Sequence, residues 1–211
     1  LIACSTKKDT FLARNSHALS TKLNILYNGQ IALDKGVKEI NDNTAENFWK
    51  RLPVEKMQLT DDVSPDGKSK NTNFELAEAK ATKAIQKHSM NIDGHEKNFQ
   101  IDEAYLLLGK SRYYDQRFIP ALDAFNYILY KYPNSSNIYD AKIWREKTNV
   151  RLGNEAVAVK NISKLIKDNE YMKKDVKKQK LNKQEFANAN AILASAFLNL
   201  EEKDSAVAKL K

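Results

Sequence analysis

The sequence predicts an all-α protein built from antiparallel helix pairs stacked in a row. Three observations lead to this prediction. Glycine and proline are scarce, at six and four in 211 residues, so few tight turns between short strands can form. Apolar residues recur at the three- and four-residue spacing of amphipathic helices. Small residues also return in the same register along the second half of the chain, which indicates a repeated unit.

Composition and charge limit the class of protein. Hydrophobic residues make up 42% of the chain and charged residues 29%, which is typical of a globular protein. The net charge of +8 favours acidic partners, such as nucleic acid, anionic lipid or an acidic protein surface. No apolar run is long enough to predict a membrane-spanning helix. The single cysteine, Cys4, excludes a disulfide framework.

The first residues, Leu1-Ile2-Ala3-Cys4, resemble the lipobox that closes the signal peptide of bacterial lipoproteins. In such proteins the thiol takes up a diacylglyceryl group, so Cys4 is the predicted lipidation site and links the chain to a membrane. Residues 1–10 are then lipobox and polar tether. The alternative is a chance apolar tetrapeptide. Lipidation would place the chain outside the cytoplasm and so disfavours nucleic acid as a partner.

Residues 11–100 are expected to form repeat-like helices. A helix is predicted over Ser16–Lys35, with a break or turn at Gly36. Its apolar face is expected to hold Leu19, Leu23, Leu26, Tyr27, Ile31 and Leu33.

A second helix is predicted from Asn43, with Glu46 in its cap. It carries Phe48, Trp49 and Leu52 and ends at Pro53.

Two surface loops are predicted, over residues 54–73 and 91–99, because these stretches are rich in turn-forming residues. Gly94 marks the second loop. Between them, Phe74–His88 shows helical spacing of Ala77, Ala81 and Ala84.

Residues 101–211 carry the repeat pattern. The tetratricopeptide repeat is a 34-residue helix pair with small residues where the helices cross, an aromatic between repeats, and proline after the second helix. One full repeat is predicted near 102–135, and its packing positions are Tyr105, Leu108, Gly109, Ala121, Phe125, Ile128 and Pro133. The chain is therefore expected to form a tetratricopeptide-type helix-pair solenoid.

Two further repeats are predicted near 138–169 and 184–211. Their small crossing residues are Ala158 in the first, and Ala194 and Ala206 in the second. A lysine-rich insertion over residues 168–183 separates them. The last repeat is incomplete and has no capping helix, so the chain is expected to be the N-terminal part of a longer protein.

Several segments resemble the SprE/PorW-type tetratricopeptide lipoproteins of the type IX secretion system of Bacteroidetes. They are DEAYLLLGKSRYY from Asp102, AFNYILYKYPN from Ala124, AKIWREK from Ala141, CSTKK from Cys4 and YNG from Tyr27. The resemblance implies a lipid-anchored scaffold of protein secretion and gliding motility on the periplasmic side of the outer membrane. It implies the outer-membrane translocon and periplasmic motor or ring proteins as partners.

The pattern of reactive side chains predicts no catalytic residue, metal site or cofactor, so the chain is expected not to be an enzyme. The histidines are His17, His88 and His95, and none has metal-ligand spacing. His88 and His95 flank a loop with acidic residues, where a weak metal site competes with the favoured interpretation of solvated loop histidines. No phosphate-binding glycine loop or nucleophile elbow is present.

Two surface features are candidates for partner binding. A cluster of lysines in the insertion is either a docking patch for an acidic partner or anionic lipid, or a solvated insertion. It comprises Lys173, Lys174, Lys177, Lys178 and Lys180. Tyr127 and Tyr130 fall outside the repeat core and are expected to face a partner.

Two alternatives to the secretion scaffold remain. One is an outer-membrane protein assembly lipoprotein, which has a similar lipobox and repeats. The other is a glycan-binding repeat lipoprotein, which would need exposed aromatic platforms. The sequence places Trp49 and Trp144 at core-like helical positions, which disfavours this second alternative.

Overall fold

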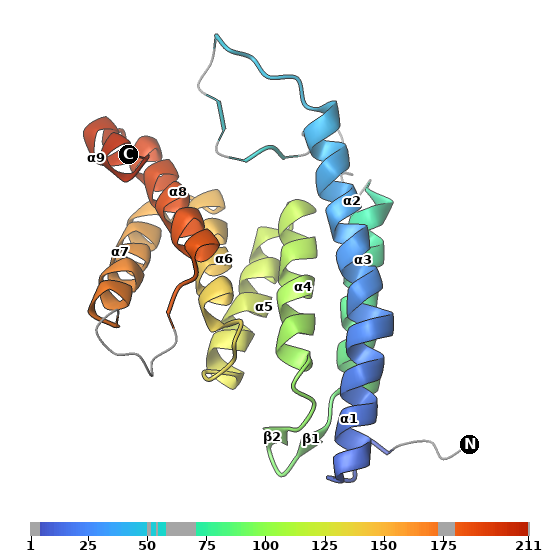
Figure 1. Cartoon of the computed structure of the whole chain (residues 1–211). Coiled ribbons are helices and arrows are strands. Elements are labelled where there is room, and N and C mark those ends of the chain that lie inside the picture. Colours follow the sequence, from blue (N-terminus) through green and yellow to red (C-terminus); the bar gives the residue numbers. More distant parts are fainter. Residues whose placement is uncertain (1–4, 50–51, 54, 58–70, 173–179, 211) are drawn as a thin grey trace.

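The computed structural model describes residues 5–49, 52–53, 55–57, 71–172 and 180–210. These residues form an all-α structure, as predicted, and one very short strand pair that the sequence did not predict (Figure 1). The helices are α1 (Phe11–Ser20), η1 (Thr21–Leu26, π-helical), α2 (Tyr27–Asn43), α3 (Thr72–His88), α4 (Ile101–Tyr114), α5 (Phe118–Lys131), α6 (Ile138–Arg151), α7 (Glu155–Met172), α8 (Lys183–Asn199) and α9 (Lys203–Leu210). The strands are β1 (Asn91–Ile92) and β2 (His95–Glu96).

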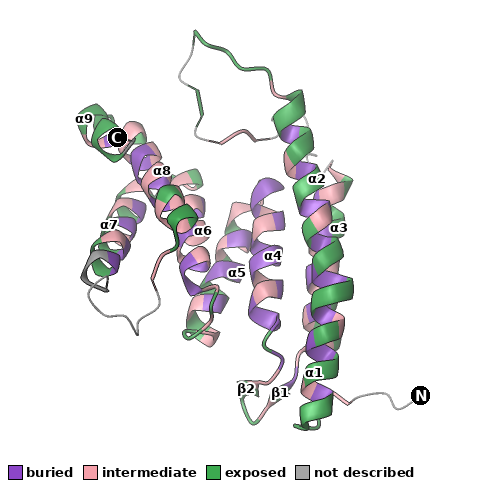
Figure 2. Cartoon of the chain, in the orientation of Figure 1, coloured by how far each residue is buried: buried purple, intermediate pink, exposed green. Residues whose placement is uncertain are grey.

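The helices pack in the order of the sequence, so that each helix from α2 to α8 contacts the next (Figure 1). The helix α6 also contacts α8, which brings the first helices of two successive pairs together. Buried residues lie along these helix contacts (Figure 2). Their side chains form two apolar clusters. One cluster runs from η1 to α6, and the other joins α6, α7 and α8.

The first predicted helix is longer than expected, because α1, η1 and α2 follow one another without a break from Phe11 to Asn43. Gly36 does not end it. A Cβ atom at Gly36 would lie 2.5 Å from the ring of Phe74, and one at Gly29 would lie 2.6 Å from Leu107 Cδ2. These glycines therefore permit close helix contact rather than a turn.

The predicted apolar face of this helix is partly wrong. Leu26 and Leu33 are buried, but Leu19, Leu23 and Tyr27 are 60%, 56% and 63% exposed. The buried face carries Ile25 and Ile40 beside Leu26 and Leu33, and small residues of both helices lie where this helix and α3 are close together. They include Ala18, Ala32, Gly29 and Gly36 on the first helix and Ala77, Ala81 and Ala84 on α3. Sequence periodicity favours the face with the most leucines as the buried one. In the structure, close packing of small residues decides which face is buried.

The helix predicted from Asn43 to Pro53 is wrong over its described residues. Asn43 is the last residue of α2, and Thr44 closes that helix with a hydroxyl donated to the Ile40 carbonyl oxygen at 2.7 Å. The residues that follow have no helical structure, and Trp49 is 98% exposed. Trp49 is therefore not the core residue that the sequence predicts, and its position does not disfavour glycan binding.

The predicted loop at 54–73 ends at Asn71, which caps α3 by accepting a hydrogen bond from the Asn73 amide. Glu55 and Met57, at its start, are half-buried rather than on the surface, and Met57 packs on the larger apolar cluster. Most of the segment lies outside the described residues.

The predicted loop at 91–99 contains the strands β1 and β2, which pair Asn91 with Glu96 and Ile92 with His95. The turn between them uses positive φ angles of 51° at Asp93 and 78° at Gly94. Glu96 stabilises the hairpin base by accepting hydrogen bonds from the Ser89 hydroxyl at 2.5 Å and the Met90 amide at 2.7 Å.

Two histidines join α1 to α3. The Nδ1 atoms of His17 and His88 lie 3.0 Å apart, and the rings meet edge-on. Burial, together with the charges of His17 and Lys83, lowers the pKa of His88 below its usual 6.5. His88 is thus the last residue of a packed helix and not a loop histidine.

We expect the free energy of unfolding to decrease as the pH falls below 6.5. The unfolded chain takes up a proton on His88 at a higher pH than the folded chain, because the folded pKa is lowered. The contribution of neutral His88 to the free energy of unfolding is therefore complete above pH 6.5. It is lost as the pH falls through the pKa of His88 in the folded chain. Urea denaturation from pH 8 to pH 5 measures this. His88→Gln is expected to reduce the change in the free energy of unfolding with pH. His95→Gln, at an exposed position, is the control and is expected to leave this pH dependence unchanged. The same pH dependence in both variants would contradict the assignment of the effect to His88.

Candidate binding pocket at the ends of three helices

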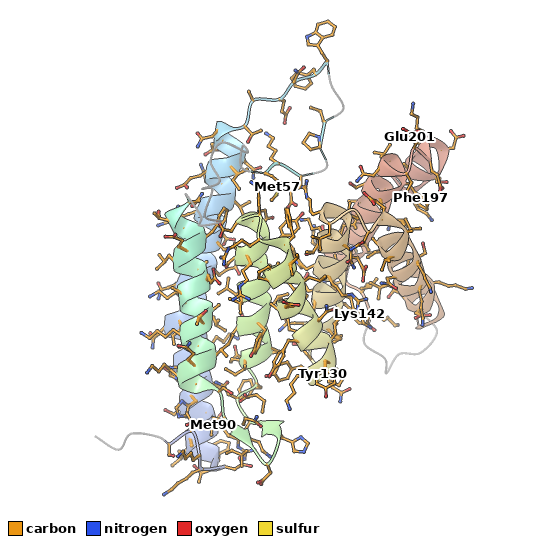
Figure 3. The ribbon with its side chains drawn as sticks, turned by 180° about the vertical axis from the view of Figure 1, so that it is seen from behind. Met57, Met90, Tyr130, Lys142, Phe197 and Glu201 are labelled. Atoms are coloured by element: carbon orange, nitrogen blue, oxygen red, sulfur yellow. The ribbon has the colours of Figure 1, made fainter. Side chains whose placement is uncertain are left out.

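A pocket of about 250 Å³ lies where the C-terminal ends of α4, α6 and α8 meet. These are the first helices of three successive pairs. Figure 3 shows Met57, Phe197 and Glu201 at this end of the array, opposite Met90 and Tyr130. The lining residues are Leu52, Pro53, Glu55, Tyr113, Lys147, Val150, Arg151, Ile192, Ser195, Leu198 and Asn199.

The carboxylate of Glu55 is held by donors from α4 and α6. Its Oε1 accepts hydrogen bonds from the Tyr114 hydroxyl at 2.7 Å and from Lys147 Nζ at 2.6 Å. Its Oε2 accepts one from the Tyr113 hydroxyl at 2.8 Å, and a guanidinium nitrogen of Arg151 lies 3.8 Å away. The helices thus supply the donors, and the segment between α2 and α3 supplies the acceptor.

Lys147 is surrounded by aromatic rings. Its Nζ lies 4.2 Å from the ring centroid of Trp144, 5.3 Å from that of Tyr113 and 5.9 Å from that of Tyr114. Burial lowers the pKa of Lys147, and the carboxylate of Glu55 opposes that shift. The ammonium group is therefore stabilised by one carboxylate and by cation–π contacts in place of water.

The two tyrosines act as hydrogen-bond donors to Glu55. Burial, followed by the charge of Glu55, raises the pKa of both Tyr113 and Tyr114 far above the usual value, so both hydroxyls keep their protons. Arg151 Nε donates to the Tyr113 hydroxyl at 3.0 Å, which orients its proton toward Glu55. Cationic side chains near a helix C-terminus also interact favourably with the negative end of the helix dipole.

The remaining wall of the pocket is mixed. Val150, Ile192 and Leu198 supply apolar surface next to Arg151, and Ser195 and Asn199 supply polar atoms. The arrangement suits a carboxylate at one side and an apolar group at the other. Among the described residues, no three His, Cys, Asp or Glu side chains come together as metal ligands.

The repeat-packing residues lie between helices and not in this pocket. Leu108, Gly109, Ala121, Phe125, Ile128, Ala158, Ala194 and Ala206 are buried. Tyr105 is half-buried, and Pro133 is exposed two residues after the end of α5. A Cβ atom at Gly109 would lie 2.4 Å from Cε1 of Phe125, so this glycine and phenylalanine define how closely α4 and α5 approach.

The aromatic residues expected to face a partner have different environments. Tyr127 stacks on Tyr105, with ring centroids 4.3 Å apart, so this side chain contributes to the packing of α4 on α5. Tyr130 is 85% exposed. Its position, at the other end of the array (Figure 3), separates it from the pocket.

Most of the other predicted binding residues lie outside the described part of the chain. These are Cys4, Lys173, Lys174, Lys177 and Lys178. Lys180 is described and is half-buried. The helix α7 continues to Met172, so the start of the predicted insertion is helical.

The pocket residues do not stand out as binding residues in the sequence. Part of their pattern is visible in the sequence, because Lys147 and Arg151 share one helix face and Tyr113 and Tyr114 end the first helix of the preceding repeat. Glu55 gives no comparable signal. It is 92 residues away from Lys147 in the chain, and only the tertiary structure brings the two together.

No described helix has the length and apolar character needed to cross a membrane. Comparison with models of known protein families found no match, and comparison with curated proteins found no significant match.

Proposed function

We propose that this chain is a tetratricopeptide-type scaffold that binds protein partners. The sequential packing of its helices and the burial of its small repeat residues support this proposal. The observation that carries it is the pocket, where three successive first helices end in cations, hydroxyl groups and apolar side chains. Helix-pair arrays of this kind commonly bind peptides and helices across adjoining repeats.

We further propose that the scaffold is anchored by lipid on Cys4 in the outer membrane, on the periplasmic side. There it bridges the type IX translocon to periplasmic motor or ring proteins. The lipobox-like start and the resemblance of the repeat segments to SprE/PorW-type lipoproteins support this role. An outer-membrane protein assembly lipoprotein is the alternative, and the identity of the captured partner separates the two.

Photo-crosslinking in whole cells of the source organism tests the proposal. A crosslinking amino acid at Ser195, in the pocket wall, is expected to capture a secretion component. The same group at Lys164, on the exposed side of α7, is the matched control and is expected to capture it less. Cys4→Ala is expected to release the protein from membranes. Capture of no envelope protein from Ser195 would contradict the scaffold, and retention in membranes would contradict the anchor.

A further inference from the structure

The pocket contains a complete binding site for a carboxylate, and its present occupant is a side chain of the same protein. The three donors to the Glu55 carboxylate, and the nearby Arg151 guanidinium, all come from α4 and α6, which are part of the helix array. Glu55 itself belongs to the segment that connects α2 to α3. The two tyrosine donors are also held by ring contacts that do not involve Glu55. Tyr113 lies edge-on to Phe118 and Trp144, and Tyr114 stacks on Phe74.

The charges of the site are not balanced. Lys147 and Arg151 contribute two positive charges, and Glu55 contributes one negative charge. The Arg151 guanidinium donates a hydrogen bond to the main-chain carbonyl oxygen of Glu55 at 3.4 Å but lies 3.8 Å from Glu55 Oε2, too far to hydrogen-bond to the carboxylate. It also lies on the pocket wall. The site therefore attracts a further carboxylate even when Glu55 is in place.

The pocket also extends past Glu55 toward α8. Ile192 and Leu198 line this part together with Val150. A segment with an acidic residue followed by an apolar residue would place its carboxylate at Lys147 and Arg151, and its apolar side chain against α8. An aliphatic contact of this kind makes binding more favourable, because it removes apolar surface from water.

We propose that the pocket binds a glutamate or aspartate side chain of a partner protein and that Glu55 is a built-in competitor for the same donors. This inference rests on the proposed scaffold function and names the class of ligand. When the partner binds, its carboxylate accepts the hydrogen bonds from Tyr113, Tyr114 and Lys147, and Glu55 turns out to solvent. The apparent affinity of the partner is reduced by the fraction of molecules in which Glu55 fills the site.

The test measures peptide binding to the whole chain by fluorescence anisotropy. The probe is a labelled, C-terminally amidated peptide of alternating glutamate and leucine, and glutamine replaces glutamate in the reference peptide. If Glu55 fills the site in about 90–99% of molecules, Glu55→Gln raises the affinity about 10- to 100-fold. Glu46→Gln is the matched control: Glu46 precedes Glu55 in the same segment and pairs with Lys56, outside the pocket. It is expected to leave the affinity unchanged.

Two more variants connect the effect to the donors. Lys147→Met in the Glu55→Gln background is expected to reduce binding more than tenfold. Glu55→Asp keeps the charge, but the aspartate is too short to reach both hydroxyl groups, so we expect an intermediate gain in affinity for the glutamate peptide. This variant also tests the proposal if Glu55→Gln does not fold. A glutamine peptide with a free C-terminus tests terminal carboxylates as the source, and we expect it to bind weakly.

Unchanged or weaker binding in both Glu55 variants, with circular dichroism showing intact helices, would overturn the competitor role. Equal binding of the glutamate and glutamine peptides would overturn the carboxylate specificity. If either occurs while Ser195 still captures a partner in cells, the scaffold proposal stands and only the ligand class is wrong. Loss of that capture would instead reject the scaffold proposal itself.

Discussion

Phe125→Ala is expected to lower the free energy of unfolding by about 3–5 kcal/mol. The side chain of Phe125 on α5 is fully buried and contacts the two neighbouring helices α4 and α6. Its ring lies against Gly109 of α4 and stacks on Trp144 of α6, with ring centroids 6.2 Å apart. Truncation leaves a cavity at the junction of two helix pairs, and the loss is a large fraction of the 5–15 kcal/mol typical of a folded domain.

Urea denaturation followed by circular dichroism measures this loss. Tyr130→Ala is the matched control, because Tyr130 lies on the same helix and is 85% exposed; it is expected to change the free energy of unfolding by about 0.5 kcal/mol or less. A similar loss in both variants would contradict the assigned core.

A double-mutant cycle tests the contact between Gly109 and Phe125 directly. Gly109→Ala alone is expected to cost about 1–3 kcal/mol through overpacking, partly offset by the higher helix propensity of alanine. Phe125→Leu removes ring atoms that the new methyl group would meet at 2.4–2.8 Å. The two changes together should therefore cost less than the sum of the single changes, and additive costs would show that the helices separate instead.

Glu146→Ala is expected to lower the free energy of unfolding by about 3 kcal/mol. Glu146 is 1% exposed and lies where α6 meets α7. Its carboxylate accepts hydrogen bonds from Arg145 Nε at 2.5 Å, Asn149 Nδ2 at 2.9 Å and Asn161 Nδ2 at 3.0 Å. Without it, two amide donors between the helices lose their acceptor, and an unpaired buried donor costs much more than an exposed one.

Thermal and urea unfolding of Glu146→Ala and Glu75→Ala provide the comparison. Glu75 is exposed in the first turn of α3, where its charge contributes about 0.3–1 kcal/mol through the helix dipole. Equal losses in the two variants would mean that the Glu146 network contributes no more than a surface charge.

The sequence predicted helices best where small and aromatic residues alternate in a fixed register. Over residues 102–135 the predicted crossing residues Gly109 and Ala121 lie in buried helix contacts, and Phe125 is fully buried. These positions are constrained locally, because antiparallel helices joined by a short turn must meet along one face. Their assignment to the tetratricopeptide family remains a proposal.

Two predictions about α2 are wrong, one in the middle of the helix and one at its C-terminal end. Gly36 was interpreted as a break, yet it meets the ring of Phe74 across a helix contact, as Gly109 meets Phe125. Asn43 was interpreted as the start of a helix, yet it ends one. A glycine or an asparagine has the same local preferences in both settings, so only the neighbouring helix determines which setting applies.

The sequence by itself determined the helical class, the scarcity of turns, the helix pair from Ile101 to Lys131 and the net positive charge. Tertiary structure alone decided which face of the first helix is buried and that Glu55 occupies a site made by α4 and α6. The physical reason is the range of the interactions. Helix periodicity and turn formation act within a few residues, whereas the contact of Glu55 with Lys147 depends on the packing of every helix between them.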